Sequence, residues 1–206
     1  MAAWLLAVVL GRPTLPWLAG FRIAGRRRIP REGGVVVVVN HVGDLDPLFV
    51  GVACAPRRAL YLADARHYRR LPFARLLFAM GALPVEPGSP DTRTLRYARE
   101  RLLAGDLIVI FAEGRPGWGA PMGEFLEGAA HLGLTPGVTV VPAAIWGVQR
   151  FMRGWRPVGR GPVLVAFGHP VPAPEDGSRR ERAAELSRRT RAAVTELLEP
   201  MMRAYP

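Results

Sequence analysis

Two uninterrupted apolar runs, Val35–Val39 and Leu107–Phe111, dominate the pattern of the chain. Neither run alternates apolar with polar residues, as a strand with one solvent-exposed face would. Each run therefore predicts a strand that is buried on both faces. Residues 139–145 and 163–167 are two further candidate strands, although the first contains Pro142, which cannot donate a hydrogen bond within a sheet.

Between these strands, apolar residues recur at three- and four-residue spacing, which predicts helices. The predicted helices cover residues 47–52, 66–80, 91–104, 123–134 and 176–198, with Asp91 capping the third and Asp176 or Ser178 capping the last. Helices that separate buried strands are typical of an α/β domain. We therefore expect a single α/β domain, in which helices flank a largely parallel mixed sheet.

A chain of 206 residues has the length of one domain. We expect an apolar N-terminal segment at residues 1–28, the α/β domain at residues 29–175, and a basic amphipathic helix packed on that domain within residues 176–206. The initial apolar run is too short to span the bilayer's hydrocarbon core, which is about 30 Å thick. Residues 1–28 are consistent with a membrane-associating segment that lies in the interface, and the alternative is a helix packed on the protein's own core.

The composition adds a strong positive charge, because 28 basic and 17 acidic residues give a net charge of +11. Such a surface attracts nucleic acid, an acidic lipid leaflet or phosphorylated small molecules. All the basic residues are arginine, so chemistry that needs a lysine, such as a Schiff base or a P-loop, is excluded. No serine lies in a Gly-x-Ser-x-Gly context, and one cysteine allows neither an intrachain disulfide nor a cysteine metal cluster.

Polar, glycine-containing segments follow both apolar runs directly. Ligands of α/β sheets bind beyond the carboxyl ends of the strands, so we expect these two segments to form one shared site. The candidate residues are Asn40, His41 and Asp46 after the first run, and Glu113, Gly114 and Arg115 after the second. Imidazole titrates near neutral pH, and a carboxylate five residues later can orient it if the chain makes one turn. His41 is therefore the candidate base, with Asp46 as its partner.

Other roles fit the same residues. His41 can end a strand while Asp46 caps the next helix, and Glu113 can cap its own loop. A metal site needs ligands at suitable spacing, and the other three histidines show none relative to His41 or to one another. We therefore predict no metal ligands and no bound cofactor.

The segment Asn40-His41-x4-Asp46 resembles the His-x4-Asp signature of the glycerolphosphate and lysophospholipid acyltransferase family. Further blocks follow in the family's order and span most of the chain. Residues 111–115 resemble its Phe-Pro-Glu-Gly-Thr-Arg block, residues 125–130 its Phe-x2-Gly-Ala segment, residues 140–145 its Val-Pro-Val-Ala-Ile strand and residues 167–171 its late Gly-x-Pro-Ile turn. This ordered set is far more specific than His-x4-Asp alone.

The resemblance implies an O-acyltransferase of phospholipid biosynthesis. His41 would deprotonate the hydroxyl of a lysophospholipid such as 1-acylglycerol 3-phosphate, Asp46 would orient His41, and the hydroxyl would attack an acyl thioester of coenzyme A or acyl carrier protein. Substrate binding would then involve Asn40, Glu113, Gly114 and Arg115. The resemblance also implies peripheral attachment to the cytoplasmic side of the cell membrane, with an anionic leaflet as partner.

Two blocks depart from the family pattern. Pro87 stands where the family usually has arginine, and Arg115 lies one position before the usual arginine. Those arginines bind the acceptor's phosphate in the family, so Arg93 or Arg96 is a candidate replacement. An acceptor without a phosphate is the alternative. Residues 71–80 can line an acyl groove or form a packed core helix.

Two other functions are alternatives. A catalytically inactive lipid-binding relative would retain the fold and lose turnover. A nucleic-acid-binding domain would explain the net charge of +11. The chain has no recognisable nucleic-acid motif, however, and such a function leaves His41 and Asp46 unexplained, so we expect no nucleic-acid partner.

Overall fold

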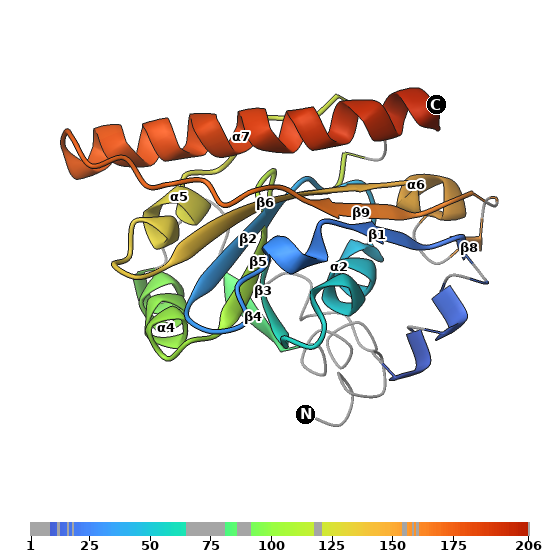
Figure 1. The fold of residues 1–206 in the computed structure, drawn as a ribbon, viewed down its shortest axis with the longest axis horizontal. Helices are drawn as coiled ribbons and strands as arrows, with labels where there is room; N and C mark the ends of the chain where they lie inside the picture. The colour runs from blue at the N-terminus through green and yellow to red at the C-terminus, as the bar shows by residue number, and fades with distance from the viewer. Residues whose placement is uncertain are drawn as a thin grey trace.

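The computed structural model describes residues 9–11, 13–15, 17, 19–64, 81–85, 92–117, 121–153, 156–157, 159 and 161–205. A seven-stranded sheet runs through the protein in the order β1-β9-β6-β2-β5-β3-β4 (Figure 1). Its strands are β1 (Arg22–Ala24), β2 (Val35–Val39), β3 (Ala59–Asp64), β4 (Ala82–Val85), β5 (Leu107–Phe111), β6 (Thr139–Trp146) and β9 (Leu164–Phe167). Every neighbouring pair is parallel except β6 with β9, which confirms the largely parallel mixed sheet. A separate two-stranded sheet pairs β7 (Met152–Arg153) with β8 (Arg156–Pro157).

The two apolar runs form β2 and β5 with the bounds that the sequence predicts. Both strands lie inside the sheet, and the five valines of β2 are at most 2% exposed. In register, Val39 at the end of β2 lies opposite Phe111 of β5 on one side and Ala143 of β6 on the other. The polar segments after β2 and β5 therefore begin side by side, at the carboxyl ends of these strands.

Pro142 lies in β6, an interior strand. Its carbonyl accepts a hydrogen bond from the amide of Gly168 at 2.7 Å, immediately after β9 ends at Phe167. The N–H and C=O of a strand residue point to the same side, so the missing donor of Pro142 faces the point where the ladder to β9 ends. Proline is tolerated there because it removes a bond only at the margin of the ladder.

The sequence did not predict β1, β3 and β4. β1 and β4 are edge strands of three and four residues, and the apolar stretch of β3 contains Tyr61 and no valine or isoleucine. Their pairing partners hold them in the sheet, which local sequence does not reveal.

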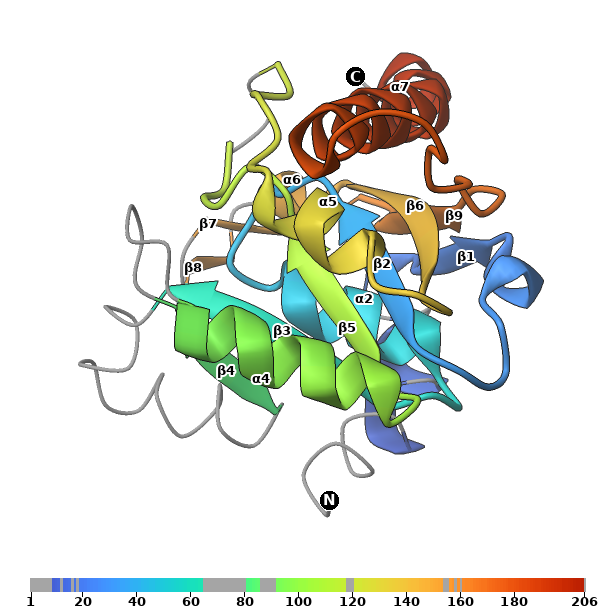
Figure 2. The same ribbon diagram turned by 90° about the vertical axis from the view of Figure 1, so that its left-hand side faces the viewer.

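Helices cover both faces of the sheet (Figure 2). One face carries α2 (Asp46–Cys54), and the opposite face carries α4 (Thr92–Leu103), α5 (Gly128–Gly133) and the first turns of α7 (Arg179–Ala204). The predicted helices at 47–52 and 91–104 correspond to α2 and α4. The predicted helix at 66–80, its suggested acyl groove and the Asp91 cap lie outside the described residues.

Two helix predictions need correction. The predicted helix at 123–134 shortens to α5, because the amides of Gly123 and Leu126 bond to Glu113 and Ala112 in the loop after β5. The last helix extends six residues beyond the predicted end, to Ala204. Its C-terminal turns reach the core, where the indole of Trp146 donates to the carbonyl of Tyr205 at 2.7 Å.

The start of α7 follows its sequence signals. The Ser178 hydroxyl accepts from the amide of Glu181, and the Glu181 carboxylate accepts from the amide of Ser178, which completes a capping box. The helix packs along β6.

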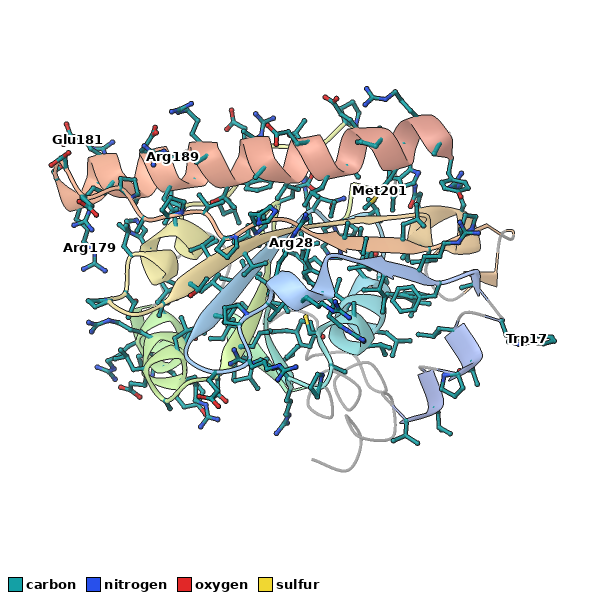
Figure 3. All side chains as sticks on the ribbon, viewed as in Figure 1. Trp17, Arg28, Arg179, Glu181, Arg189 and Met201 are labelled. Carbon is teal, nitrogen blue, oxygen red and sulfur yellow. The ribbon has the colours of Figure 1, made fainter. Side chains whose placement is uncertain are left out.

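The N-terminal segment divides its side chains between core and solvent. Its described residues up to 19 are helical, and Leu15 and Ala19 are buried in the core. Val9 and Leu10 are exposed, and Trp17 is 93% exposed and projects away from the rest of the protein (Figure 3). The segment thus packs on the core along one side and presents apolar groups on the other. No helix in the described part of the chain has the length and apolar character needed to cross a membrane.

The cysteine at the end of α2 provides a test of this packing. Cys54 is 2% exposed, and burial raises the pKa of its thiol to about 12, although the nearby charge of Arg57 acts in the opposite direction. At pH 8 the thiolate fraction in the folded protein is then roughly 10⁻⁴. We expect iodoacetamide to label Cys54 only when the protein opens, so adduct formation followed by mass spectrometry should be slow in native buffer and rapid in denaturant. Labelling at the rate of a free cysteine in native buffer would contradict this packing.

Candidate functional site

The structure brings His41 and Asp46 into direct contact beyond the carboxyl end of β2. Nδ1 of His41 lies 2.7 Å from Oδ2 of Asp46. The five-residue spacing closes because the chain turns through Gly43 before α2 begins at Asp46, where the amide of Asp46 donates to the carbonyl of Gly43 at 3.1 Å. The predicted pairing of these two side chains is therefore confirmed.

Asp46 is held by its own loop. Its Oδ2 also accepts from the amides of Val42 and Gly43, at 2.6 and 3.0 Å. The side chain is fully buried, and its other oxygen, Oδ1, has no hydrogen-bond partner among the described residues. All the described hydrogen bonds of this carboxylate thus converge on one oxygen, which fixes where the His41 ring must lie.

This arrangement sets the roles of the two ring nitrogens of His41. An oxygen that already accepts two backbone N–H groups faces the ring as an acceptor, so Nδ1 donates the proton of the 2.7 Å contact. Nε2 then carries the free lone pair. Because the ring is 14% exposed, it remains within reach of a small reacting group.

Two aromatic residues that the sequence analysis missed support the ring. Phe111 ends β5 and stacks on His41, with ring centroids 4.4 Å apart and planes inclined by 28°. Tyr61 of β3 stacks in turn against Phe111, with ring centroids 6.5 Å apart, and its hydroxyl donates to the carbonyl of Pro47 at 2.8 Å. Burial raises the pKa of Tyr61 well above its usual value, which keeps this hydroxyl a donor. The sequence signal for Phe111 was its position: it is an aromatic residue at the end of a buried strand, directly before the polar segment.

Glu113 bridges the site. One carboxylate oxygen accepts from the amide of His41 at 2.9 Å, and the other accepts from the amide of Gly123 at 2.8 Å. The carbonyl of His41 accepts in turn from the amide of Gly117 at 2.8 Å. We expected Glu113 to shape a substrate pocket, but its described contacts are to backbone. They join the loops after β2 and β5 and fix the backbone of His41 from both sides.

Asn40 is also occupied by backbone. Its side-chain amide donates to the carbonyl of Ile145 at 2.9 Å, and its side-chain carbonyl accepts from the amide of Ile145 at 2.8 Å. The residue is 1% exposed, so it cannot present these atoms to a ligand. The expected substrate-binding role gives way to a structural one, in which Asn40 ties the end of β2 to β6.

Gly114 and Arg115 lie in the turn that follows β5. Gly114 has φ +69°, a left-handed conformation that favours glycine, and a Cβ there would meet only the movable end of the Leu126 side chain. Its amide donates to the carbonyl of Phe111 at 3.0 Å. Arg115 is exposed on the same turn, next to Glu113. Of the predicted substrate-binding residues, Arg115 is the one whose charged group faces solvent near the dyad's loops.

The two other candidate arginines lie on α4. Arg93 is exposed in the first turn of that helix. Arg96 lines a cavity of about 290 Å³ between α4, α5 and the start of α7, together with Leu95, Arg99, His131, Leu132 and Arg179. Neither His41 nor Asp46 lines this cavity, so the expectation that Arg96 contacts a phosphate beside the dyad is not supported.

The site can carry out proton transfer at Nε2 of His41. The single cysteine of the chain lies at the far end of α2 from Asp46, and no group of three or more His, Cys, Asp or Glu side chains within the described ranges is placed to hold a metal ion. The described geometry therefore offers a histidine base without an adjacent protein nucleophile. A base of this kind can accept a proton from a hydroxyl group or a water molecule.

Comparison with known proteins gives consistent matches. A family model described as Acyltransferase matches residues 20–146, which contain the dyad and Glu113. The chain is similar to a 1-acyl-sn-glycerol-3-phosphate acyltransferase of Borreliella burgdorferi, with 28% identity over 146 residues. The match covers 66% of this chain and 55% of that relative, so the chain spans about half the length of the relative.

A solved structure has the same fold. The crystal structure of the 1-acyl-sn-glycerophosphate (LPA) acyltransferase from Thermotoga maritima superimposes with a TM-score of 0.71 and 21% sequence identity. The superposition covers 94% of this chain and 79% of the other. The sheet order and flanking helices described above are thus those of a known architecture.

The bridging role of Glu113 is testable through stability. In Glu113→Gln, one end of the side chain becomes an NH₂ group that faces a backbone N–H, so at least one of the two bonds to the charged carboxylate is lost. We expect the free energy of unfolding to fall by about 1–3 kcal/mol, measured by urea denaturation.

Glu127→Gln is the matched control, because the carboxylate of Glu127 is largely exposed and only approaches His131 at 3.6 Å. Its unfolding free energy should stay within about 0.5 kcal/mol of the wild type. Equal unfolding free energies of the two variants would show that the bonds of Glu113 do not stabilise the fold.

Proposed function

The chain belongs to the acyltransferase family, and on that premise we propose that it is an O-acyltransferase that moves a fatty acyl group from an acyl thioester to the free hydroxyl of a lysophospholipid. The observation that supports this function best is the 2.7 Å contact between His41 and Asp46. It directs the lone pair of Nε2 outward and leaves the ring partly exposed. A base in this position suits an alcohol acceptor.

In the proposed reaction, Nε2 of His41 removes the proton from the acceptor hydroxyl as its oxygen attacks the thioester carbonyl. The new C–O bond forms, and the tetrahedral intermediate collapses with cleavage of the C–S bond. The proton held by His41 then passes to the departing thiolate, so the products are an ester and a thiol. Asp46 keeps Nδ1 protonated and stabilises the imidazolium between these two transfers.

Acyl transfer in this scheme is direct. No cysteine lies near His41, and none of the chain's serines lies in a nucleophile motif, so the scheme contains no acyl-enzyme. All the proton-transfer groups belong to the protein or its two substrates, and we propose no bound metal or cofactor. An inactive lipid-binding relative would have no need for the buried Asp46 carboxylate beside His41.

For the acceptor we propose a lysophospholipid with a phosphate, such as 1-acylglycerol 3-phosphate. Relatives named for this substrate support the choice. Arg115, exposed on the turn after Glu113, is the candidate phosphate ligand, because a guanidinium can bind phosphate through two parallel hydrogen bonds. The donor would be an acyl thioester of coenzyme A or of acyl carrier protein.

Both substrates are amphiphiles, which favours work at a membrane surface. We propose that the protein attaches peripherally to the cytoplasmic side of the cell membrane. The exposed apolar side chains of Val9, Leu10 and Trp17 support this attachment.

Removing the base tests the proposed mechanism. His41→Ala should lower kcat for acyl transfer by about 10²–10⁴-fold, because general-base catalysis is lost. The assay incubates purified protein with a radiolabelled acyl thioester and a panel of lysolipids, and follows labelled product together with thiol release. Circular dichroism and thermal unfolding establish that the variant is folded.

His131→Ala is the matched control, because this histidine lies on α5 near Glu127 and lines a cavity that neither His41 nor Asp46 lines. It should retain wild-type kcat. Full thioester-dependent activity of His41→Ala would refute the assignment, and absence of thiol release by the wild type with every lysolipid would favour a lipid-binding relative.

The acceptor's phosphate is tested separately. Arg115→Gln removes a charge-assisted contact, so the KM for 1-acylglycerol 3-phosphate should rise by about 10–100-fold while the KM for the thioester stays unchanged. Arg180→Gln, an exposed arginine at the start of α7, is the control with the same charge change. An equal rise in KM for the two variants would contradict a phosphate contact at Arg115. Preference of the wild type for a lysolipid without phosphate would show that the acceptor is a different lipid.

A further inference from the structure

We propose that a second site, on the side of η1 (Arg26–Arg28) and the C-terminal end of α2, binds the anionic head group of an acidic membrane lipid. The site adds a specific lipid partner to the proposed peripheral acyltransferase. This inference rests on the proposed function only in assuming that the protein acts at a membrane.

Two neighbouring cavities share the side chains of Arg26 and Arg27. The first, of about 510 Å³, is lined by Phe21, Ile23, Gly25, Arg26, Arg27, Arg28 and Val52. The second, of about 660 Å³, is lined by Arg26, Arg27, Ile29, Pro30, Arg31, Cys54, Ala55, Pro56 and Arg57. None of the described residues that line either cavity is acidic, so both concentrate positive charge beside apolar walls.

Two of these arginines already have structural partners. Arg28 donates to the carbonyl of Phe167 at 2.7 Å. Arg57 donates to the carbonyls of Pro30, Gly33 and Gly105, at 2.6–3.0 Å, and burial lowers the pKa of its guanidinium. These contacts hold the loops around the cavities in place.

Three arginines remain for a ligand. Within the part of the chain that the structure describes, the guanidinium groups of Arg26, Arg27 and Arg31 make no hydrogen bond or ion pair. Arg27 and Arg31 are exposed and Arg26 is half-buried. A lipid phosphate placed at Arg26 and Arg27 would therefore meet donors whose other partner is water.

The first basic cavity adjoins the side of the N-terminal segment that packs on the core. Val52 lines the first cavity, and a Cβ on Gly11 of the N-terminal segment would lie 3.1 Å from a methyl group of Val52. Phe21, which directly follows that segment, lines the same cavity. Residues 9–31 thus combine exposed apolar side chains, Val9, Leu10 and Trp17, with arginines that make no ion pair within the described part of the chain.

This combination selects a lipid surface among the possible anionic partners. Apolar side chains gain free energy by entering the acyl boundary, while arginines interact with phosphates and acidic head groups at the membrane surface. Nucleic acid or a free phosphate would use the arginines but leave Trp17 and the apolar cavity walls in water. The site is also distinct from the dyad, because α2 separates Asp46 from Cys54 by about 12 Å of helix.

The test compares the full-length protein with Arg26→Gln/Arg27→Gln by co-sedimentation with vesicles. The vesicles contain phosphatidylcholine alone or phosphatidylcholine with phosphatidylglycerol. Each arginine near an acidic membrane surface contributes about fivefold to binding, so the double variant should partition onto acidic vesicles about 10- to 30-fold less strongly. Its partitioning onto neutral vesicles should change less than twofold.

Two further variants complete the design. Arg99→Gln/Arg180→Gln removes the same charge from the opposite face, from α4 and α7, and should weaken binding to acidic vesicles by no more than about twofold. Trp17→Ser should weaken binding to both kinds of vesicle, because it removes an apolar contact. If the two arginine double variants lost the same amount of binding to acidic vesicles, the effect would come from net charge alone, and the proposal of a specific site would be wrong.

The other anionic partners give different results. Binding of a fluorescent single-stranded RNA or of glycerol 1-phosphate that depends on Arg26 and Arg27, with vesicle binding unaffected by their replacement, would overturn the lipid assignment. Failure of the lipid site can also be told apart from failure of the proposed reaction. His41→Ala should bind acidic vesicles as the wild type does, whatever its effect on acyl transfer.

Discussion

The site depends on one oxygen atom, Oδ2 of Asp46, which accepts hydrogen bonds from the His41 ring and from the amides of Val42 and Gly43. The carboxylate is fully buried, and a buried charge is costly unless donors surround it. The same three donors therefore stabilise the charge, close the turn after β2 and orient the imidazole. Loss of any one of these donors would therefore affect the charge, the turn and the orientation of the imidazole together.

Residues that look like ligands in the sequence connect strands in the structure. Glu113 joins the loops after β2 and β5, and Asn40 joins β2 to β6 through both side-chain atoms. A base acts only when its position is fixed to a fraction of an ångström, and loops after strands are otherwise free to shift. These polar side chains supply that rigidity through their bonds to backbone groups.

The helix α2 connects the dyad with the proposed lipid site. Its first residue, Asp46, holds the dyad, while Val52 and Cys54 at its other end line the two arginine-rich cavities. A helix packed on a buried sheet is a rigid spacer. A lipid head group bound at one end would consequently hold the dyad at a constant height above the membrane from which the acceptor comes.

The sequence by itself determined the central strands β2 and β5, the His41–Asp46 pair and the family, because buried parallel strands leave uninterrupted apolar runs and a five-residue turn is a local event. It did not determine β1, β3 and β4, the shortening of α5, or the true partners of Asn40 and Glu113. Those depend on contacts between residues distant in the chain: 105 positions separate Asn40 from Ile145, and 72 separate His41 from Glu113. Only the packed sheet brings such groups within hydrogen-bond distance, so tertiary structure alone decided that Asn40 and Glu113 bond to the backbone.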